Sequence, residues 1–401
     1  MSPRPVSTDK QGTTADPNHP LHKLTPEQLE ELGREFQAIH DEVYADLGER
    51  DAEYIRGLIR FHRRLAAVSR IALLGSGSTI GLVAGTAGLS VAKILENMEI
   101  GHNVLHGQWD WMNDPKIHSS TWEWDSASPS SSWKHSHNYV HHTYTNVIGK
   151  DKDVGYEIMR VDERQPWKPA YLGQPIYNLL LAALFEWGVA FHDLDLEAMR
   201  NGEKPMTQVK EELRGIVRKA MRQVVKDYIA FPLLSGRNWR RTLAANATAN
   251  VVRNVWAYAI IFCGHFPDQA YTFTEEEAAD ESMGAWYVRQ LIGAANIEGG
   301  DTFHLMSGNL SFQVEHHLFP DMPSSRYKEI APRVKDICDR YELPYNTGPF
   351  LKQFGSVQRS LLRLAFPGGF QKRKPGPYVA PEPPASATET NPLRRAFPQV
   401  V

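Results

Sequence analysis

The pattern of apolar and charged residues predicts a mainly helical chain with membrane-spanning segments. The stretch from Ile71 to Ala92 carries no charged residue and is long enough to cross a bilayer core of about 30 Å. Its glycines recur every three or four residues, a spacing that lets another helix approach closely. The stretches Pro169–His192 and Thr242–Pro267 are weaker candidates, because Glu186 and Arg253 interrupt them. A glycine-rich loop in a soluble enzyme is the alternative for the first stretch.

The distribution of positive charge suggests how these segments are arranged. Residues 193–241 include eleven lysines and arginines, which the positive-inside rule places in the cytoplasm. If Pro169–His192 crossed the membrane, the histidines before it would lie on the opposite side from this loop. We therefore expect Pro169–His192 to lie along the interface, and Val224–Gly236 and Leu243–His265 to form the hairpin. The prediction is an all-α, integral membrane helical bundle with a cytoplasmic helical cap.

Composition narrows the class of protein. The 401 residues include 44 Lys and Arg against 47 Asp and Glu, a near balance that excludes a nucleic-acid binder acting by bulk positive charge. The two cysteines form no CxxC pair, so a disulfide scaffold or a zinc ribbon is not expected. Residues 1–24 and 366–401 are polar or rich in proline, which predicts disordered tails on either side of one folded domain, residues 25–365.

Histidine is the residue type with the most unusual distribution. Of the 16 histidines, seven fall in three short clusters. Each of the first two clusters contains a pair four residues apart, which lies on one face of a helix and can share or bracket a metal ion. The third cluster places an amide and two imidazoles on one helical turn. The clusters consist of His102 and His106; His137, His141 and His142; and Gln313, His316 and His317.

This pattern points to a metal centre. Imidazole is a preferred ligand of iron, copper, zinc and nickel, and seven clustered histidines exceed the four ligands of one tetrahedral zinc. A dinuclear site is therefore implied, and ligation by histidine without thiolate suits iron that activates oxygen. Histidines satisfied by hydrogen bonds in a polar cap would have to account for three clusters at once.

The three clusters resemble the histidine boxes of the membrane-bound fatty acid desaturase family. The boxes read His102-Asn-Val-Leu-His106, His137-Asn-Tyr-Val-His141-His142 and Gln313-Val-Glu-His316-His317, and the resemblance runs from about Glu99 to Tyr327. Glutamine in the third box is similar to the branch that includes linoleoyl-CoA and front-end desaturases. That branch usually carries a fused haem carrier domain, and no such motif occurs here.

The resemblance implies an activity and its cofactors. It implies a helical membrane enzyme that holds two iron ions on the cytoplasmic face and inserts a cis double bond into an acyl-CoA or acyl-lipid, using O2 and two electrons. It also implies a separate ferredoxin- or haem-type electron donor with its reductase. Membrane lipid is an expected partner, nucleic acid is not, and no catalytic residue is expected beyond the metal ligands.

The resemblance adds one ligand to the seven clustered histidines. A further histidine near the end of a late membrane helix completes the metal shell in this family, and His265 stands where it is expected. Other residues near the clusters are candidates for weaker ligands or for groups that orient the ligating imidazoles. These are Gln313, His304, His135, Asp110, Asp151, Asp153 and Glu315.

Aromatic and basic residues suggest where a substrate binds. Five tryptophans between the first two clusters could line an acyl tunnel, although an aromatic belt or core packing explains them equally well. They are Trp109, Trp111, Trp122, Trp124 and Trp133. Arg237, Arg240 and Arg241 could anchor the phosphates of CoA or of a lipid, unless they only form a solvated basic loop.

Two other functions remain open at this point. A hydroxylase could be built on the same scaffold, because an oxidant that removes one hydrogen can return a hydroxyl group instead of taking a second hydrogen. A membrane metal-binding or transport protein is the more distant alternative. It would place histidines inside the apolar segments, whereas here they flank them.

Overall fold

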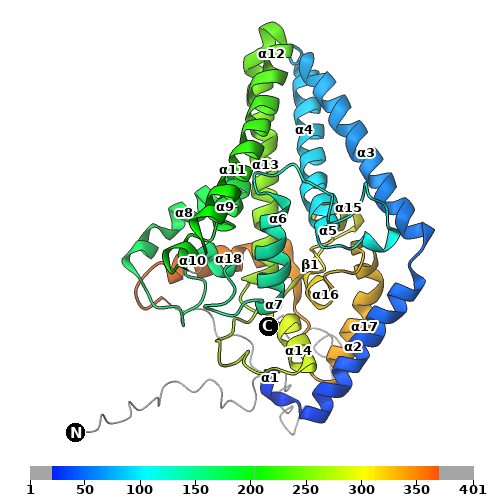
Figure 1. Ribbon diagram of the computed structural model, residues 1–401, viewed down its shortest axis with the longest axis vertical. Helices are drawn as coiled ribbons and strands as arrows, with labels where there is room; N and C mark the ends of the chain where they lie inside the picture. Colours follow the sequence, from blue (N-terminus) through cyan, green and yellow to red (C-terminus); the bar gives the residue numbers. More distant parts are fainter. Residues whose placement is uncertain (1–19, 203, 370–401) are drawn as a thin grey trace, which may run out of the picture.

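The computed structural model describes residues 20–202 and 204–369. In Figure 1 a broad body of short helices carries a tapering projection of long helices. The short helix α1 (Pro20–Lys23) and helix α2 (Pro26–Asp46) begin the described chain at the body. Helix α2 starts at a capping box formed by Thr25 and Gln28. Helix α1 lies within the stretch expected to be a tail; residues 1–19 and 370–401 of the two expected tails lie outside the described residues.

The projection consists of two helical hairpins packed side by side (Figure 1). The first hairpin joins α3 (Glu49–Leu74) to α4 (Thr79–Leu95), which continues through the π-helix η2 (Glu96–His102) into α5 (Asn103–Leu105). The second hairpin runs through α11 (Met206–Gln223), η7 (Val224–Ala230), α12 (Phe231–Leu234), η8 (Gly236–Asn238) and α13 (Trp239–His265).

The first hairpin corrects one prediction. The apolar stretch Ile71–Ala92 is not one helix, because α3 ends at Leu74 and a turn of residues 75–78 reverses the chain. The side chain of Ser78 caps the start of α4 by accepting a hydrogen bond from the backbone N–H of Gly81. The expected close approach does occur: a Cβ atom on Gly85 would lie 2.8 Å from the side chain of Leu73 on α3.

The sequence predicted the second hairpin, but its two predicted arms, Val224–Gly236 and Leu243–His265, are shorter than the helices in the structure. Its turn also corrects the suggested role of Arg237, Arg240 and Arg241. These residues lie at the tip of the projection, far along α13 from His265 at the other end of that helix. The guanidinium of Arg241 donates hydrogen bonds to the carbonyl oxygens of Ser76 and Gly77, so it ties the two turns together. This position does not suit the anchoring of a substrate whose reacting end lies in the body.

The surface of the projection is unusually apolar. Ile71, Ile80, Val83, Leu233 and Leu234 are each more than 60% exposed. By length and composition, the continuous helix Thr79–Leu105 is the one described helix apolar enough to cross a membrane. Large exposed apolar surfaces on a folded protein mark places where lipid or another protein binds.

The stretch Pro169–His192 forms three short helices on the flank of the body. They are η6 (Pro169–Gly173), α8 (Gln174–Ala183) and α9 (Phe185–His192), with a break at Leu184. None is long enough to span a bilayer. Ile176, Leu179 and Leu180 are more than half exposed, so α8 presents an apolar face outward.

The remaining elements build the body. They are η3 (Asp110–Met112), α6 (Ser130–Trp133), η4 (Lys134–His141), α7 (His142–Tyr144), η5 (Val154–Glu157), α10 (Leu196–Arg200), α14 (Met283–Gly293), α15 (Asp301–Met306), α16 (Gln313–Leu318), η9 (Ser324–Arg326), α17 (Tyr327–Arg340) and α18 (Phe350–Leu364). The mainly helical prediction is correct. The exception among described residues is a two-stranded parallel sheet of β1 (Asn296–Glu298) and β2 (Thr347–Pro349), in which Ile297 pairs with Gly348.

Candidate metal centre

The first two histidine clusters lie in or beside π-helical turns. The π-helix η2 ends at His102, and η4 carries His137 and His141. A π-turn inserts an extra residue into an α-helix and is frequent at functional sites. In both places the extra residue rotates the following turn of the helix, so the histidines point to a different side than they would on a regular α-helix. His316 and His317 come from the short helix α16, and His265 is the last residue of α13.

The structure brings all eight predicted histidines into one cluster. Their ring nitrogens form overlapping groups within which the donor atoms lie no more than 4.8 Å apart. One group contains His102, His106, His137 and His316; a second contains His141, His265 and His317; a third joins His142 to His316 and His317. The first and second groups share no residue, so the cluster offers two separate positions for a metal ion, with His142 next to both.

These imidazoles are buried and their inner nitrogens have no partner. His316 and His317 have no exposed surface, and burial lowers the pKa of both rings and of His142 well below the ordinary value, so the rings are neutral. The Nε2 atoms of six histidines form no hydrogen bond: His106, His137, His141, His142, His316 and His317. An unpaired buried nitrogen is costly. Neutral imidazoles with unpaired nitrogens close to one another fit metal ions of the kind that histidine binds.

The Nδ1 atoms of five of the rings have partners of the kind that orient metal-binding histidines, whereas Nδ1 of His142 and of His265 is buried without one. Asp151 lies 2.9 Å from Nδ1 of His141. Burial lowers the pKa of His141, but the interaction with Asp151 outweighs it and raises the pKa overall. Asp153 is 3.4 Å from Nδ1 of His137 and 3.0 Å from Nε2 of His192. Two of the predicted carboxylates therefore orient imidazoles.

Sequence reasoning missed several residues that orient the histidines. The side-chain carbonyl of Gln290 lies 3.2 Å from Nδ1 of His317, and the Tyr327 hydroxyl lies 3.2 Å from Nδ1 of His316. Asn103 lies 3.0 Å from Nδ1 of His102. Asn103 stands inside the first box and could have been found there. Gln290 and Tyr327 carry no local signal, because only folding brings them to the cluster.

Other weaker candidates lie outside the cluster. His304 bonds to the hydroxyl of Ser311, and His135 stacks on Tyr139. Asp110 accepts hydrogen bonds from the backbone and hydroxyl of Ser119. Glu315 accepts hydrogen bonds from Asn296 and Tyr345, and burial raises its pKa to about 7. These four residues therefore contact no histidine of the cluster.

Gln313 lies at the cluster itself. Its Nε2 atom is 3.1 Å from Nε2 of His265, and its side-chain oxygen is buried without a hydrogen bond. An amide oxygen left unpaired next to an imidazole is available to a metal ion or to a water molecule bound by one. Gln313 therefore lies where it could bind a metal ion or orient a water molecule, and its role stays a prediction.

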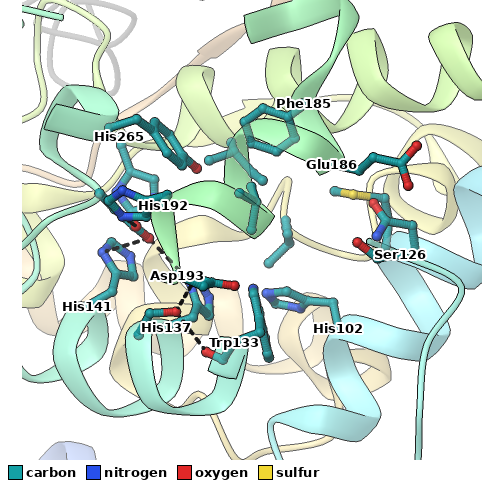
Figure 2. A pocket seen from close by; sticks show the side chains of 18 of the residues that line it. His102, Ser126, Trp133, His137, His141, Phe185, Glu186, His192, Asp193 and His265 are labelled. Atoms are coloured by element: carbon teal, nitrogen blue, oxygen red, sulfur yellow. Dashed lines mark hydrogen bonds and ion pairs between the residues drawn. The ribbon is translucent and has the colours of Figure 1, made fainter. Parts of the chain in front are cut away.

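A cavity reaches the cluster from the side of α9 and α13 (Figure 2). It is lined on one side by His102, His137, His141 and His265. Apolar side chains line much of the remainder, among them Met98, Phe185, Val189, Ile261, Phe266 and Leu310. An apolar cavity that ends at a group of metal-binding side chains suits an alkyl chain presented to a metal centre.

Two of the five predicted tunnel tryptophans line this cavity, namely Trp124 and Trp133. Trp133 stacks on His137 with ring centroids 4.5 Å apart. Trp109 instead is fully buried against Tyr54 in a separate apolar cluster, and Trp111 and Trp122 pack beside that cluster. For these three, core packing is the role that the structure supports.

Comparison with known proteins identifies the family. The model of the fatty acid desaturase family matches residues 78–349, which contain all three histidine boxes. The NADPH-dependent stearoyl-CoA 9-desaturase of Mycobacterium tuberculosis (strain H37Rv) is 50% identical over 348 residues, covering 86% of this chain and 82% of that protein. The sn-1 linoleoyl-lipid 6-desaturase of Synechocystis is 25% identical over 273 residues, covering 66% and 75% of the two chains. No solved structure matches. The chain belongs to the fatty acid desaturase family.

Proposed function

We propose that this fatty acyl desaturase holds two iron ions with its eight clustered histidines and introduces a cis double bond into an acyl-CoA. The observation that carries the proposal is the convergence of buried, neutral imidazoles whose inner nitrogens have no partner. A centre of two irons would supply the oxidising power, drawn from O2 and two electrons, that removes two hydrogens from an unactivated alkyl chain.

In this proposal the first ion is bound by His102, His106, His137 and His316, and the second by His141, His265 and His317. His142 completes the shell between them, and Gln313 either binds or orients a water molecule. Asp151 and Asp153 fix the orientation of the second-box histidines and increase their basicity. The protein's own contribution to the chemistry is to hold these ligands, exclude bulk water and position the substrate.

Substrate position follows from the shape and polarity of the cavity. Much of the lining is apolar, and an alkyl chain has no polar group at its reacting carbons, so the distance from an anchored headgroup must select those carbons. The Mycobacterium relative is named a stearoyl-CoA 9-desaturase. At 50% identity across most of both chains, we infer the same substrate class and the same bond position here.

We further propose that the apolar end of the projection, formed by η7, α12 and the adjoining parts of α3, α4 and α13, is embedded in the membrane, and that the body and the basic helix α11 lie on the cytoplasmic side. The exposed apolar side chains of the two hairpins and the candidate spanning helix support this arrangement. The apolar outer face of α8 would then rest at the interface. Lys210, Arg214, Arg218 and Arg222 are exposed along the length of α11, on the body side of η7.

The test is expression in a host that lacks 9-desaturation, supplied with stearoyl-CoA or its free acid, beside a His141→Ala variant. A new acid lacking two hydrogens, formed only by the intact chain, would support the proposal, and its cleavage fragments would locate the bond. A product that gains one oxygen would indicate the hydroxylase instead. Purified protein without bound iron would overturn the di-iron assignment.

A further inference from the structure

A basic groove lies on the surface between α11 and the segment that leads into α6. On the α11 side it is lined by Lys210, Arg214, Arg218 and Arg222, and on the other side by Ser131 and Ser132 among others. The four cations are spaced four residues apart and all are exposed. Like charges at this spacing destabilise a helix. The repulsion within this stripe lowers the stability of α11, so the stripe is expected to serve a purpose other than folding.

The protein does not neutralise this stripe. Within residues 20–202 and 204–369, none of the four cations forms an ion pair, although many other basic residues do. Two acidic residues of the groove already have partners: Glu123 pairs with Lys219, which also lines the groove, and Glu212 pairs with Lys204 at 2.6 Å. Glu211 is the remaining acid of the groove, so positive charge predominates.

The wall of the groove leads directly to the histidine cluster. Helix α6 contains Ser131 and Ser132, ends at Trp133 and continues without interruption into η4, which carries His137. The ring of Trp133 stacks on His137 at 4.5 Å and meets the edges of His102 and His106, each at 5.4 Å between centroids. Figure 2 shows Trp133 beside His102 and His137. Trp133 therefore directly follows the groove residue Ser132 in α6, and its buried ring contacts three histidines of the cluster.

The groove is separate from the cavity assigned to the acyl chain, because no residue lines both. A CoA headgroup bound in the groove would therefore be cut off from its own acyl chain by the wall that holds Trp133. The stripe from Lys210 to Arg222 also extends about 18 Å along the helix, which is longer than a pair of linked phosphates and matches the face of a protein.

We propose that this groove is the docking surface for an acidic one-electron carrier protein, whose electrons reach the metal centre through Trp133. The inference rests on the proposed function. It identifies the partner that delivers the electrons as an acidic protein, because the groove is basic. Each double bond requires two such transfers: RCH2CH2R′ + O2 + 2 e⁻ + 2 H⁺ gives RCH=CHR′ + 2 H2O. Two carrier molecules are oxidised by one electron each, and O2 takes up the electrons.

The experiment uses the full chain, loaded with iron in lipid nanodiscs, with stearoyl-CoA, an acidic plant-type [2Fe–2S] ferredoxin, its reductase and NADPH. The test variant is R214Q/R218Q. The control is R237Q/R240Q, which removes the same charge at the tip of the projection. Each protein is also driven by dithionite in a single turnover, which bypasses docking.

In the test variant we expect the KM for ferredoxin to rise about tenfold at low salt, and this difference to shrink at high salt because the interaction is electrostatic. The KM for stearoyl-CoA and the dithionite-driven turnover should stay at the wild-type level, and the control should match the wild type throughout. An unchanged KM for ferredoxin would overturn the proposal, as would turnover with dithionite but none with ferredoxin.

Other occupants give other results. A raised KM for stearoyl-CoA, with competition by free CoA, would assign the groove to CoA. A defect that depends only on the fraction of anionic lipid in the nanodisc would assign it to lipid headgroups. If the wild type forms no product even with dithionite, the proposed function itself fails, and this outcome is distinct from the failure of docking alone.

Trp133 is tested by the ratio of ferredoxin-driven to dithionite-driven rates. This ratio should fall several-fold in W133L and recover in large part in W133F, which retains an aromatic ring, while iron content is measured in parallel. Equal ratios in the wild type and both variants would remove Trp133 from the electron route.

Discussion

The projection and the body both bury polar groups, but they satisfy them in opposite ways. In the projection, Asp227 of η7 accepts from Arg70 of α3 at 2.7 Å and from Lys93 of α4 at 2.8 Å. Asn246 and Asn250 of α13 also donate to Asp227. In the body, the buried imidazoles leave their inner nitrogens without any partner.

This difference separates a structural cluster from a binding site. The charges around Asp227 neutralise one another and fix how three helices pack, so they need nothing from outside. In the histidine cluster, by contrast, neutral imidazoles face one another with unpaired nitrogens, which fit an added metal ion. The asparagines spaced every four residues on α13, namely Asn246, Asn250 and Asn254, likewise donate hydrogen bonds to neighbouring helices.

The largest effect is expected in the body. Replacement of His316 by alanine should abolish desaturation and bound iron, because His316 belongs to two of the histidine groups. The measurements are the number of iron ions bound per chain and the conversion of stearoyl-CoA to product. His304→Ala is the matched control, since His304 lies outside the cluster, and it should retain iron. Loss of iron from both variants alike would contradict the assigned ligand set.

The next largest effect is expected in the projection. Asp227→Leu removes a partner from the buried Lys93, which keeps Asp125 at 3.6 Å, and from the partly buried Arg70, and should destabilise the fold by about 3 kcal/mol. The variant in which Arg70, Lys93 and Asp227 are all replaced by apolar residues should recover most of this loss. Thermal unfolding in nanodiscs measures both. An equally unstable triple variant would mean that the cluster contributes more than mutual neutralisation.

A smaller effect is expected at a residue that orients a ligand. Asp151→Asn keeps the shape of the side chain but removes the charge beside His141. Outer partners of this kind contribute about 10–100-fold to metal affinity. In Asp151→Asn, iron titration against a competing chelator should show an iron affinity about 10–100-fold lower, while the protein stays folded. Wild-type affinity in the variant would show that the geometry of the ring alone is sufficient.

The smallest effect is expected at a histidine on the rim of the body. Both nitrogens of His40 have acidic partners, Asp321 and Asp41, each at 3.3 Å. The hydrogen bond to Asp321 raises the pKa of His40 although burial opposes it. Its stabilising effect is therefore complete below the unfolded-state pKa and is lost as the pH rises through the higher folded-state pKa. His40→Gln should show a smaller fall in Tm from pH 6 to pH 8; an identical fall would contradict this.

The sequence predicted the content of the site better than its surroundings. The three boxes and His265 were identified from spacing and resemblance, and the structure brings all eight histidines together. The apolar stretch Ile71–Ala92 was wrongly read as one helix, because hydropathy does not reveal that Gly75 to Ser78 reverse the chain. Three of the five tryptophans do not line the cavity, since composition cannot tell a tunnel wall from a packed core.

What the sequence determines by itself is local. The spacing of His102 and His106, or of His137 and His141, places each pair on one helical face, because helix geometry fixes which neighbours share a face. Only the tertiary structure decides that His102 meets His316, that Gln290 supports His317, and that Trp133 packs against His102. Those contacts join residues far apart in the chain, and the packing of whole helices sets them, so no local pattern encodes them.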